Sequence, residues 1–83
     1  MLENEQLARL RKAGVPDTGN RVALAIELTG KKQGEVADDL EMPQSQLSDI
    51  ARGRFPDPKL STAHKLAEYF GCQIEDLFPS RAA

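Results

Sequence analysis

The sequence predicts an all-helical protein, and three observations support that prediction. Apolar residues recur three and four positions apart, as Val36, Ala37 and Leu40 do, which gathers them on one side of a helix. Glycines and prolines fall between these segments, where helices commonly end or begin. No stretch shows the alternation of apolar and polar residues that is typical of a half-buried β-strand.

Residues 2–13 are expected to form the first helix, within an N-terminal helical extension over residues 1–17. Leu7 and Leu10 share one side of this helix, and its acidic residues precede its basic ones, the order that suits the helix dipole. Gly14 is its predicted end. Because the apolar stripe is narrow, the helix either packs on the body of the protein, packs on a partner chain, or frays. We favour packing on the body.

The main domain is expected to span residues 18–79 and to open with a well-buried helix. Thr18 is the predicted N-cap of this helix, which should run to about Thr29 and end at Gly30. Its apolar residues, from Val22 to Leu28, cover much of its circumference.

Two short amphipathic helices are predicted over residues 33–52, with the break Glu41-Met42-Pro43 between them. Such a pair is a helix-turn-helix unit. The second helix should end at Gly53 and bury one face. Its other face carries small polar side chains that favour contact with the edges of bases, or with solvent alone: Gln44, Ser45, Ser48, Asp49 and Arg52.

Two further helices are expected to complete the domain. Asp57 and Pro58 resemble an N-cap followed by a first helical residue, which predicts a helix over 58–70. This helix should end at Gly71, and a short last helix should open at Gln73. Residues 80–83 are a predicted tail. The inward positions of the longer helix are expected to be Leu60, Ala63, Leu66, Ala67 and Phe70.

Length and composition argue for one small domain without catalytic chemistry. Eighty-three residues leave no room for a second core. The single cysteine, Cys72, is expected to be a small buried residue rather than a redox switch, and neither Cys72 nor His64 has neighbours at metal-ligand spacing. We therefore expect no enzyme activity, no metal and no cofactor. With no signal peptide and no apolar run long enough to cross a bilayer, we expect a soluble cytoplasmic protein.

The charge balance opposes binding to nucleic acid. The formal net charge of the chain is −2, whereas nucleic-acid-binding domains are usually basic. Between Lys31 and Lys59, five basic residues stand against six acidic ones. A positive surface can therefore arise only from the way the chain folds.

Three stretches of the sequence nevertheless form an ordered set. They are Gln33-x-x-Val36-Ala37-x-x-Leu40, then Met42-x-Gln44-Ser45-x-Leu47-x-x-Ile50-x-x-Gly53, then Lys65-Leu66-Ala67-Glu68-Tyr69-Phe70-Gly71-x-x-Ile74-Glu75-Asp76-Leu77-Phe78. From about Val22 to Phe78 the chain resembles the Xre/Cro/CI-type helix-turn-helix family, whose lambda-repressor-like DNA-binding fold has five helices. The resemblance implies that fold, preceded here by an extra N-terminal helix.

The resemblance also implies roles for particular residues. Gln33 would hold a DNA phosphate and brace the first recognition side chain. Four residues would contact bases in the major groove: Gln44, Ser45, Ser48 and Asp49. Four others would contact phosphates, although in isolation each is an ordinary solvated cation: Lys32, Arg52, Arg54 and Lys59. The last helix would supply a dimer interface through Ile74, Leu77 and Phe78, which could instead be core.

The chain departs from the family pattern at three places. Glu41 occupies a turn position with positive φ that often holds glycine, and Pro43 replaces the usual capping Ser or Thr. Ile26 and Ala51 match positions where many members pair an Arg with a Glu, so apolar contact is expected there instead of an ion pair.

The predicted function is that of a sequence-specific DNA-binding transcription regulator, a repressor acting as a homodimer on a roughly palindromic operator. The alternative is a protein-interaction module or an antitoxin-type helix-turn-helix protein that binds a partner protein. Positive charge around the starts of the two helix-turn-helix helices would favour DNA, and negative charge there would favour a protein partner.

Overall fold

The computed structural model describes residues 1–54 and 58–79, and within these ranges it contains helices and no strand. The all-helical prediction is confirmed. The expected N-cap Asp57 and the expected tail, 80–83, lie outside the described residues. In chain order the helices are α1 (Asn4–Lys12), α2 (Val22–Thr29), α3 (Gln33–Asp39), α4 (Gln44–Ala51), α5 (Leu60–Phe70) and α6 (Ile74–Leu77).

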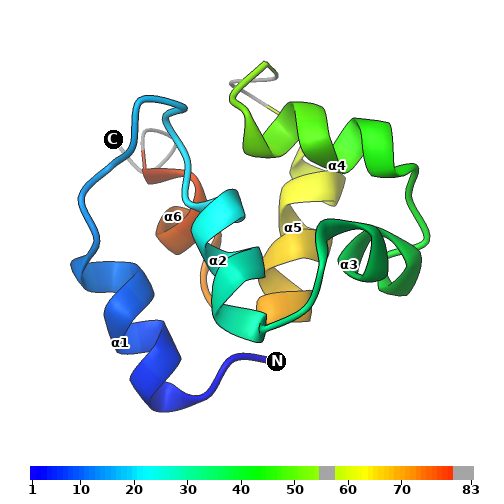
Figure 1. Ribbon diagram of the computed structural model, residues 1–83. Coiled ribbons are helices and arrows are strands. Elements are labelled where there is room, and N and C mark those ends of the chain that lie inside the picture. The colour runs from blue at the N-terminus through cyan, green and yellow to red at the C-terminus, as the bar shows by residue number, and fades with distance from the viewer. Residues whose placement is uncertain (55–57, 80–83) are drawn as a thin grey trace.

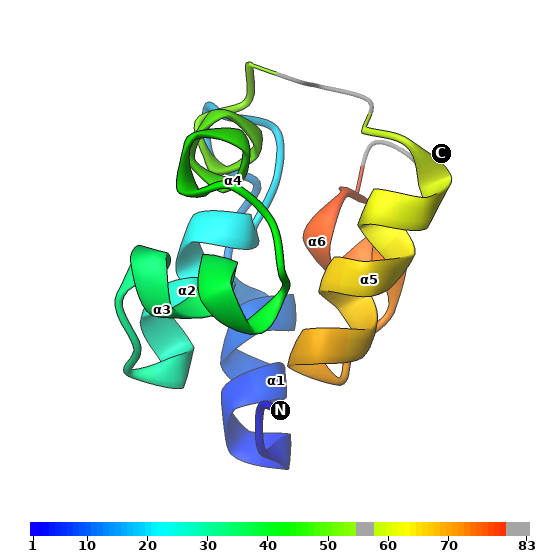
Figure 2. The same cartoon turned by 90° about the vertical axis from the view of Figure 1, so that its right-hand side faces the viewer.

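The helices surround one hydrophobic core. Figure 1 shows α3 and α4 on one side of α2, with α1 and α6 on the other side. The view turned by 90° shows α5 across from α3 and α4 (Figure 2). Each helix contributes at least one buried apolar side chain to this core: Leu10, Val22, Val36, Leu47, Phe70 and Leu77.

The N-terminal helix packs on the body of the protein, as favoured above. Leu10 is 0% exposed, and Leu2 just before the helix is buried as well. The Leu2 amide donates a hydrogen bond of 2.9 Å to the Phe70 carbonyl, which holds the N-terminus beside the last turn of α5 (Figures 1 and 2). The Gln6 side chain donates one of 2.7 Å to the Leu28 carbonyl. Residues 1–12 are therefore part of the folded domain.

The end of α1 differs from the prediction. The helix stops at Lys12 because Ala13 already has an extended backbone, with ψ of 139°, so Gly14 is not the stop. The Ala13 carbonyl accepts a hydrogen bond of 2.8 Å from Arg21, whose guanidinium also donates to the Asp76 carbonyl at 3.2 Å. Arg21 thus ties the end of α1 to α6 at the point where α2 begins.

The predicted N-cap Thr18 is wrong, because α2 begins only at Val22. The Val22 amide instead donates to the side-chain oxygen of Asn20, at 3.0 Å. The amide nitrogen of the same side chain donates to the Ile50 carbonyl in α4, at 2.8 Å. Asn20 is buried, and both ends of its side chain are paired, so it couples the start of α2 to α4.

The start of α5 also differs from the prediction. The helix begins at Leu60, so Pro58 lies two residues ahead of it rather than at its first position. Leu60 was predicted to point inward, but it is 60% exposed. It is the first residue of α5 and lies one turn before Ala63, the first buried residue of that helix. The other predicted inward residues of α5 are buried: Ala63, Leu66, Ala67 and Phe70.

The turn between α3 and α4 has the predicted backbone. Glu41 has φ of +55° and is the one non-glycine residue with positive φ in the described ranges. Pro43 precedes α4 with φ of −61°, and no side chain caps that helix. The Met42 amide donates to the Ala37 carbonyl at 3.0 Å, which closes the turn over the small residue where α3 and α4 meet.

Candidate nucleic-acid interface

The outer face of α4 carries the residues that were predicted to contact bases. Leu47, Ile50 and Ala51 are buried against the core, which directs the opposite face of the helix to solvent. On that face Gln44 and Ser45 are exposed, whereas Ser48 and Asp49 are half-buried. The first turn of α4 contains no acidic residue that would repel a phosphate backbone.

The start of α3 borders this face on the side of Gln44. The Gln44 amide lies so close to Gly34 that a Cβ on Gly34 would be 3.3 Å from its Oε1 atom. The predicted brace, Gln33, instead borders a hollow of about 250 Å³ that Ile26 and Ala51 also line. No hydrogen bond joins Gln33 to Gln44 among the described residues. The Gln44 amide thus lies beside Gly34, a residue for which the sequence predicted no role.

Ile26 and Ala51, the positions that were expected to replace an ion pair by apolar contact, are both buried and border the same hollow. Two apolar side chains here need no charged partners, so the interface between α2 and α4 avoids the desolvation cost of a buried ion pair.

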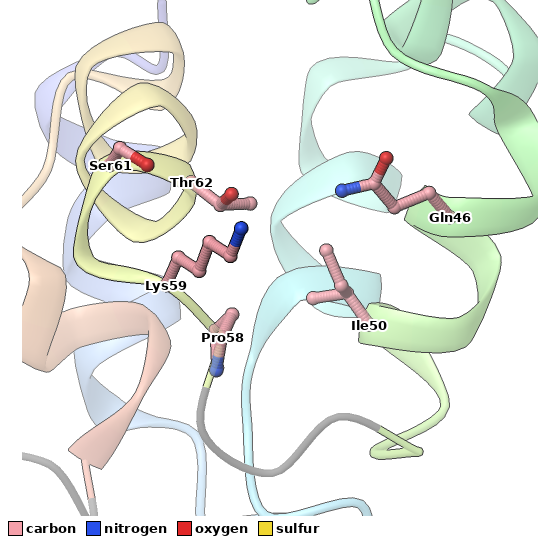
Figure 3. A pocket seen from close by; sticks show the side chains of 6 residues that line it. All are labelled: Gln46, Ile50, Pro58, Lys59, Ser61 and Thr62. Atoms are coloured by element: carbon pink, nitrogen blue, oxygen red, sulfur yellow. The ribbon is translucent and has the colours of Figure 1, made fainter.

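The start of α5 borders the other side of the α4 face. A groove of about 450 Å³ separates the two helices, and Figure 3 shows Gln46 and Ile50 on its α4 wall. Lys59 and Thr62 point from the opposite wall toward them. Lys59, a predicted phosphate contact, therefore lies on the flank of α4 opposite to Gln44 and Gly34.

Two predicted site residues are paired with each other. A guanidinium nitrogen of Arg54 lies 3.4 Å from a carboxylate oxygen of Asp49, and the Arg54 amide donates to the Asp49 carbonyl at 2.9 Å. The family resemblance implied a base contact for Asp49 and a phosphate contact for Arg54. Their proximity compensates part of each charge, so a DNA contact by either residue would compete with a weak surface ion pair.

A second cluster compensates Lys31. The Asp39 carboxylate accepts hydrogen bonds from the Tyr69 hydroxyl, at 2.6 Å, and from the Lys31 ammonium, at 2.9 Å. The hydrogen bond from Tyr69 and then that from Lys31 lower the pKa of Asp39, and the bond to Asp39 raises the pKa of Lys31. Burial is the main cause that raises the pKa of Tyr69. This cluster fastens the end of α3 to α5 and draws Lys31 away from the start of α3.

Three predicted phosphate contacts take part in no ion pair within residues 1–54 and 58–79: Lys32, Arg52 and Lys59. All three are exposed. Lys32 precedes α3, Arg52 ends α4, and Lys59 precedes α5. Among residues 1–54 and 58–79, the fold thus places three cations that form no ion pair on both flanks and at the end of α4, although the linear count showed no basic patch.

The residues predicted for a dimer interface are mainly core. Leu77 is 0% and Phe78 is 2% exposed, so neither has surface to offer a second chain. Ile74 is half-buried and borders a hollow on the surface between α5 and α6, which His64 and Cys72 also line. Of the three predicted dimer residues, only Ile74 retains accessible surface.

Cys72 is half-buried, and burial raises the pKa of its thiol to about 11. His64 is exposed, and no cluster able to hold a metal ion occurs in the part of the chain that the structure describes. None of the described helices has the length and apolarity needed to span a membrane.

The raised pKa predicts that Cys72 reacts slowly with electrophiles. A thiol with a pKa of about 11 forms about a hundredfold less thiolate near pH 8 than one with the ordinary value of 9.0. The rate of iodoacetamide alkylation, followed by mass spectrometry, should therefore be about tenfold or more lower in the folded chain than in the same chain unfolded in urea, since the higher nucleophilicity of a thiolate of raised pKa offsets part of the difference. Equal rates would contradict the prediction.

Helix α4 packs against α3 and exposes a polar face on its other side, which is the arrangement of a helix-turn-helix unit. A family model described as helix-turn-helix matches residues 22–77, which is about two thirds of the chain. The chain belongs to this helix-turn-helix family, which consists of DNA-binding regulators of transcription. The matched segment begins at α2 and leaves α1 outside it. Comparison with curated proteins and with solved structures gives no match.

Proposed function

We propose that this protein is a sequence-specific regulator that inserts α4 into the major groove of duplex DNA. The observation that carries the proposal is the polar face of α4, bordered by three exposed cations that take part in no ion pair in the described ranges. Cations that flank such a helix bind the two phosphate backbones that border the groove. The net charge of −2 does not prevent this, because Lys32, Arg52 and Lys59 border α4 whatever the balance of charge over the whole chain.

The proposed base contacts follow from the chemistry of the α4 face. The Gln44 amide can form paired hydrogen bonds with adenine, and the Ser45 and Ser48 hydroxyls can bond several bases. Asp49 could accept from the amino group of cytosine, but it already pairs with Arg54. We therefore assign the main base contacts to Gln44, Ser45 and Ser48.

The proposed phosphate contacts are of two kinds. Lys32, Arg52 and Lys59 are exposed cations, and Gln33 lies next to Lys32 at the start of α3. Arg54 would contact phosphate only in competition with Asp49. Because phosphate contacts position the protein without specifying sequence, their loss should weaken binding to every duplex alike.

We further propose a homodimeric repressor acting in the cytoplasm. One helix of this length contacts too few base pairs to select a single operator, and a two-fold dimer doubles the site. Since Leu77 and Phe78 are core, the surface around Ile74 is the part of the predicted interface that is still accessible. Sedimentation of the protein with and without its DNA site would measure the oligomeric state.

The experiment that tests the function is selection of duplexes from a random pool, followed by competition binding at several salt concentrations. Gln44→Ala should lose preference at one base position, by about 1–3 kcal/mol. Arg52→Ala should weaken all duplexes and reduce the salt dependence by about one phosphate contact. Arg52 is preferred to Arg54 for this test because removing Arg54 would also release Asp49.

Gln46→Ala is the matched control for Gln44→Ala. Both are exposed glutamines of α4, but Gln46 lies on the groove facing α5, so its loss should leave base preference unchanged. Equal affinity of the unaltered protein for selected and random duplexes would refute the proposal. That outcome would favour the alternative, a protein-interaction or antitoxin-type module, for which the acidic net charge is the sequence evidence.

A further inference from the structure

Gly34 is a glycine that the backbone does not require. It is the second residue of α3 and is not among the glycines with positive φ. Glycine is also a poorer helix former than alanine, so its presence in a helix of seven residues is unfavourable for α3. Some feature other than backbone conformation must account for the absence of a side chain here.

The surroundings of Gly34 supply that feature. A Cβ at this position would lie 3.3 Å from Oε1, 3.6 Å from Cδ and 3.8 Å from Nε2 of Gln44. All three atoms belong to one amide group, and they are the nearest neighbours that a Cβ would meet. The Gln44 amide therefore lies beside Gly34, where a Cβ would press on its oxygen and make ordinary contact with its carbon and nitrogen.

We propose that Gly34 is a specificity-determining residue that positions the Gln44 amide. By lacking a side chain, it lets this amide lie against the start of α3, which sets the direction in which its oxygen and nitrogen meet a base. Two simultaneous hydrogen bonds to one adenine require both atoms of the amide to be correctly placed. This role rests on the proposed function, since it concerns the same recognition helix.

Gly34→Ala should therefore alter recognition without damaging the fold. A Cβ 3.3 Å from Oε1 is a tight contact that shifts the Gln44 amide by a few tenths of an ångström, and the group that moves is an exposed, flexible side chain rather than backbone. The melting temperature should stay the same or rise, because alanine favours the helix. A merely structural role for Gly34 predicts the opposite, a lower melting temperature with base preference retained.

The test compares the base preferences and melting temperatures of the unaltered protein, Gly34→Ala and Gly14→Ala. Gly14 is the matched control, because a Cβ there would meet nothing within 4 Å and its φ is not positive. We expect Gly34→Ala to change relative preference at the base contacted by Gln44 by about fivefold or more, and Gly14→Ala to change it not at all. In a Gln44→Ala background, Gly34→Ala should have no further effect on preference.

A nuclear Overhauser measurement on the free protein separates this proposal from the proposed function. It should show contact between the Gly34 α-protons and the Gln44 side-chain amide. If that contact is missing, or if Gly34→Ala keeps the original preference, the positioning role is overturned while DNA recognition stands. If the contact is present but the unaltered protein selects no sequence, the proposed function fails, and the specificity role fails with it.

Discussion

Leu10→Ala is expected to lower the free energy of unfolding by about 2–5 kcal/mol, the range for deleting a leucine side chain from a packed core. Leu10 is fully buried although it lies in α1, outside the segment that the family model matches. Its removal would leave a cavity between α1 and the body of the protein, and the hydrogen bonds that hold α1 at both ends limit how far the helix can move to fill it. Urea unfolding followed by circular dichroism would measure the change.

Leu60→Ala is the control for this experiment. It makes the same chemical change at a leucine that is 60% exposed, so we expect a change within about 0.5 kcal/mol. A similarly small effect of Leu10→Ala would show that α1 detaches from the domain in solution. The larger effect would establish residues 1–12 as part of the core rather than an appended segment.

The helices could be predicted because their signals are local. Leu47 and Ile50 lie on one side of α4 by spacing alone, and a glycine with positive φ follows α2, α4 and α5: Gly30, Gly53 and Gly71. The helix starts were predicted less well. The side chain of Asn20 accepts a hydrogen bond from the first amide of α2. It is held in that position by a second, buried hydrogen bond to the Ile50 carbonyl, thirty positions along the chain.

The candidate site was predictable as a face but not as a set of pairings. The outward direction of Gln44 and Ser45 follows from helical periodicity. Asp49 pairs with Arg54 because of the path that the chain takes after α4, and Asp39 pairs with Tyr69 because α5 lies beside α3. The spacing of residues along the sequence reveals neither arrangement. These pairings determine which cations remain available, and a linear charge count contains no information about them.

Gly53→Ala is expected to lower the free energy of unfolding by about 2–5 kcal/mol, since left-handed strain costs about 1–2 kcal/mol and overpacking about 1–3 kcal/mol. Gly53 has φ of +81°, which a residue with a Cβ adopts only under strain. Its Cβ would also lie 3.0 Å from both Cα and C of Thr18 and closer still to the Thr18 carbonyl oxygen. Neither side of that contact is a flexible side chain, so the backbone itself must move.

Gly30→Ala separates the two contributions. Gly30 has a similar φ of +76°, but a Cβ there would meet nothing within 4 Å, so we expect only the conformational cost, about 1–2 kcal/mol. The excess for Gly53→Ala, measured by urea unfolding, is then the cost of displacing Thr18. Because Asn20, two residues further on, bonds the Ile50 carbonyl, that displacement should also reach α4 and weaken DNA binding. Equal effects of the two substitutions would show that the loop at Thr18 moves freely and does not hold α4 in place.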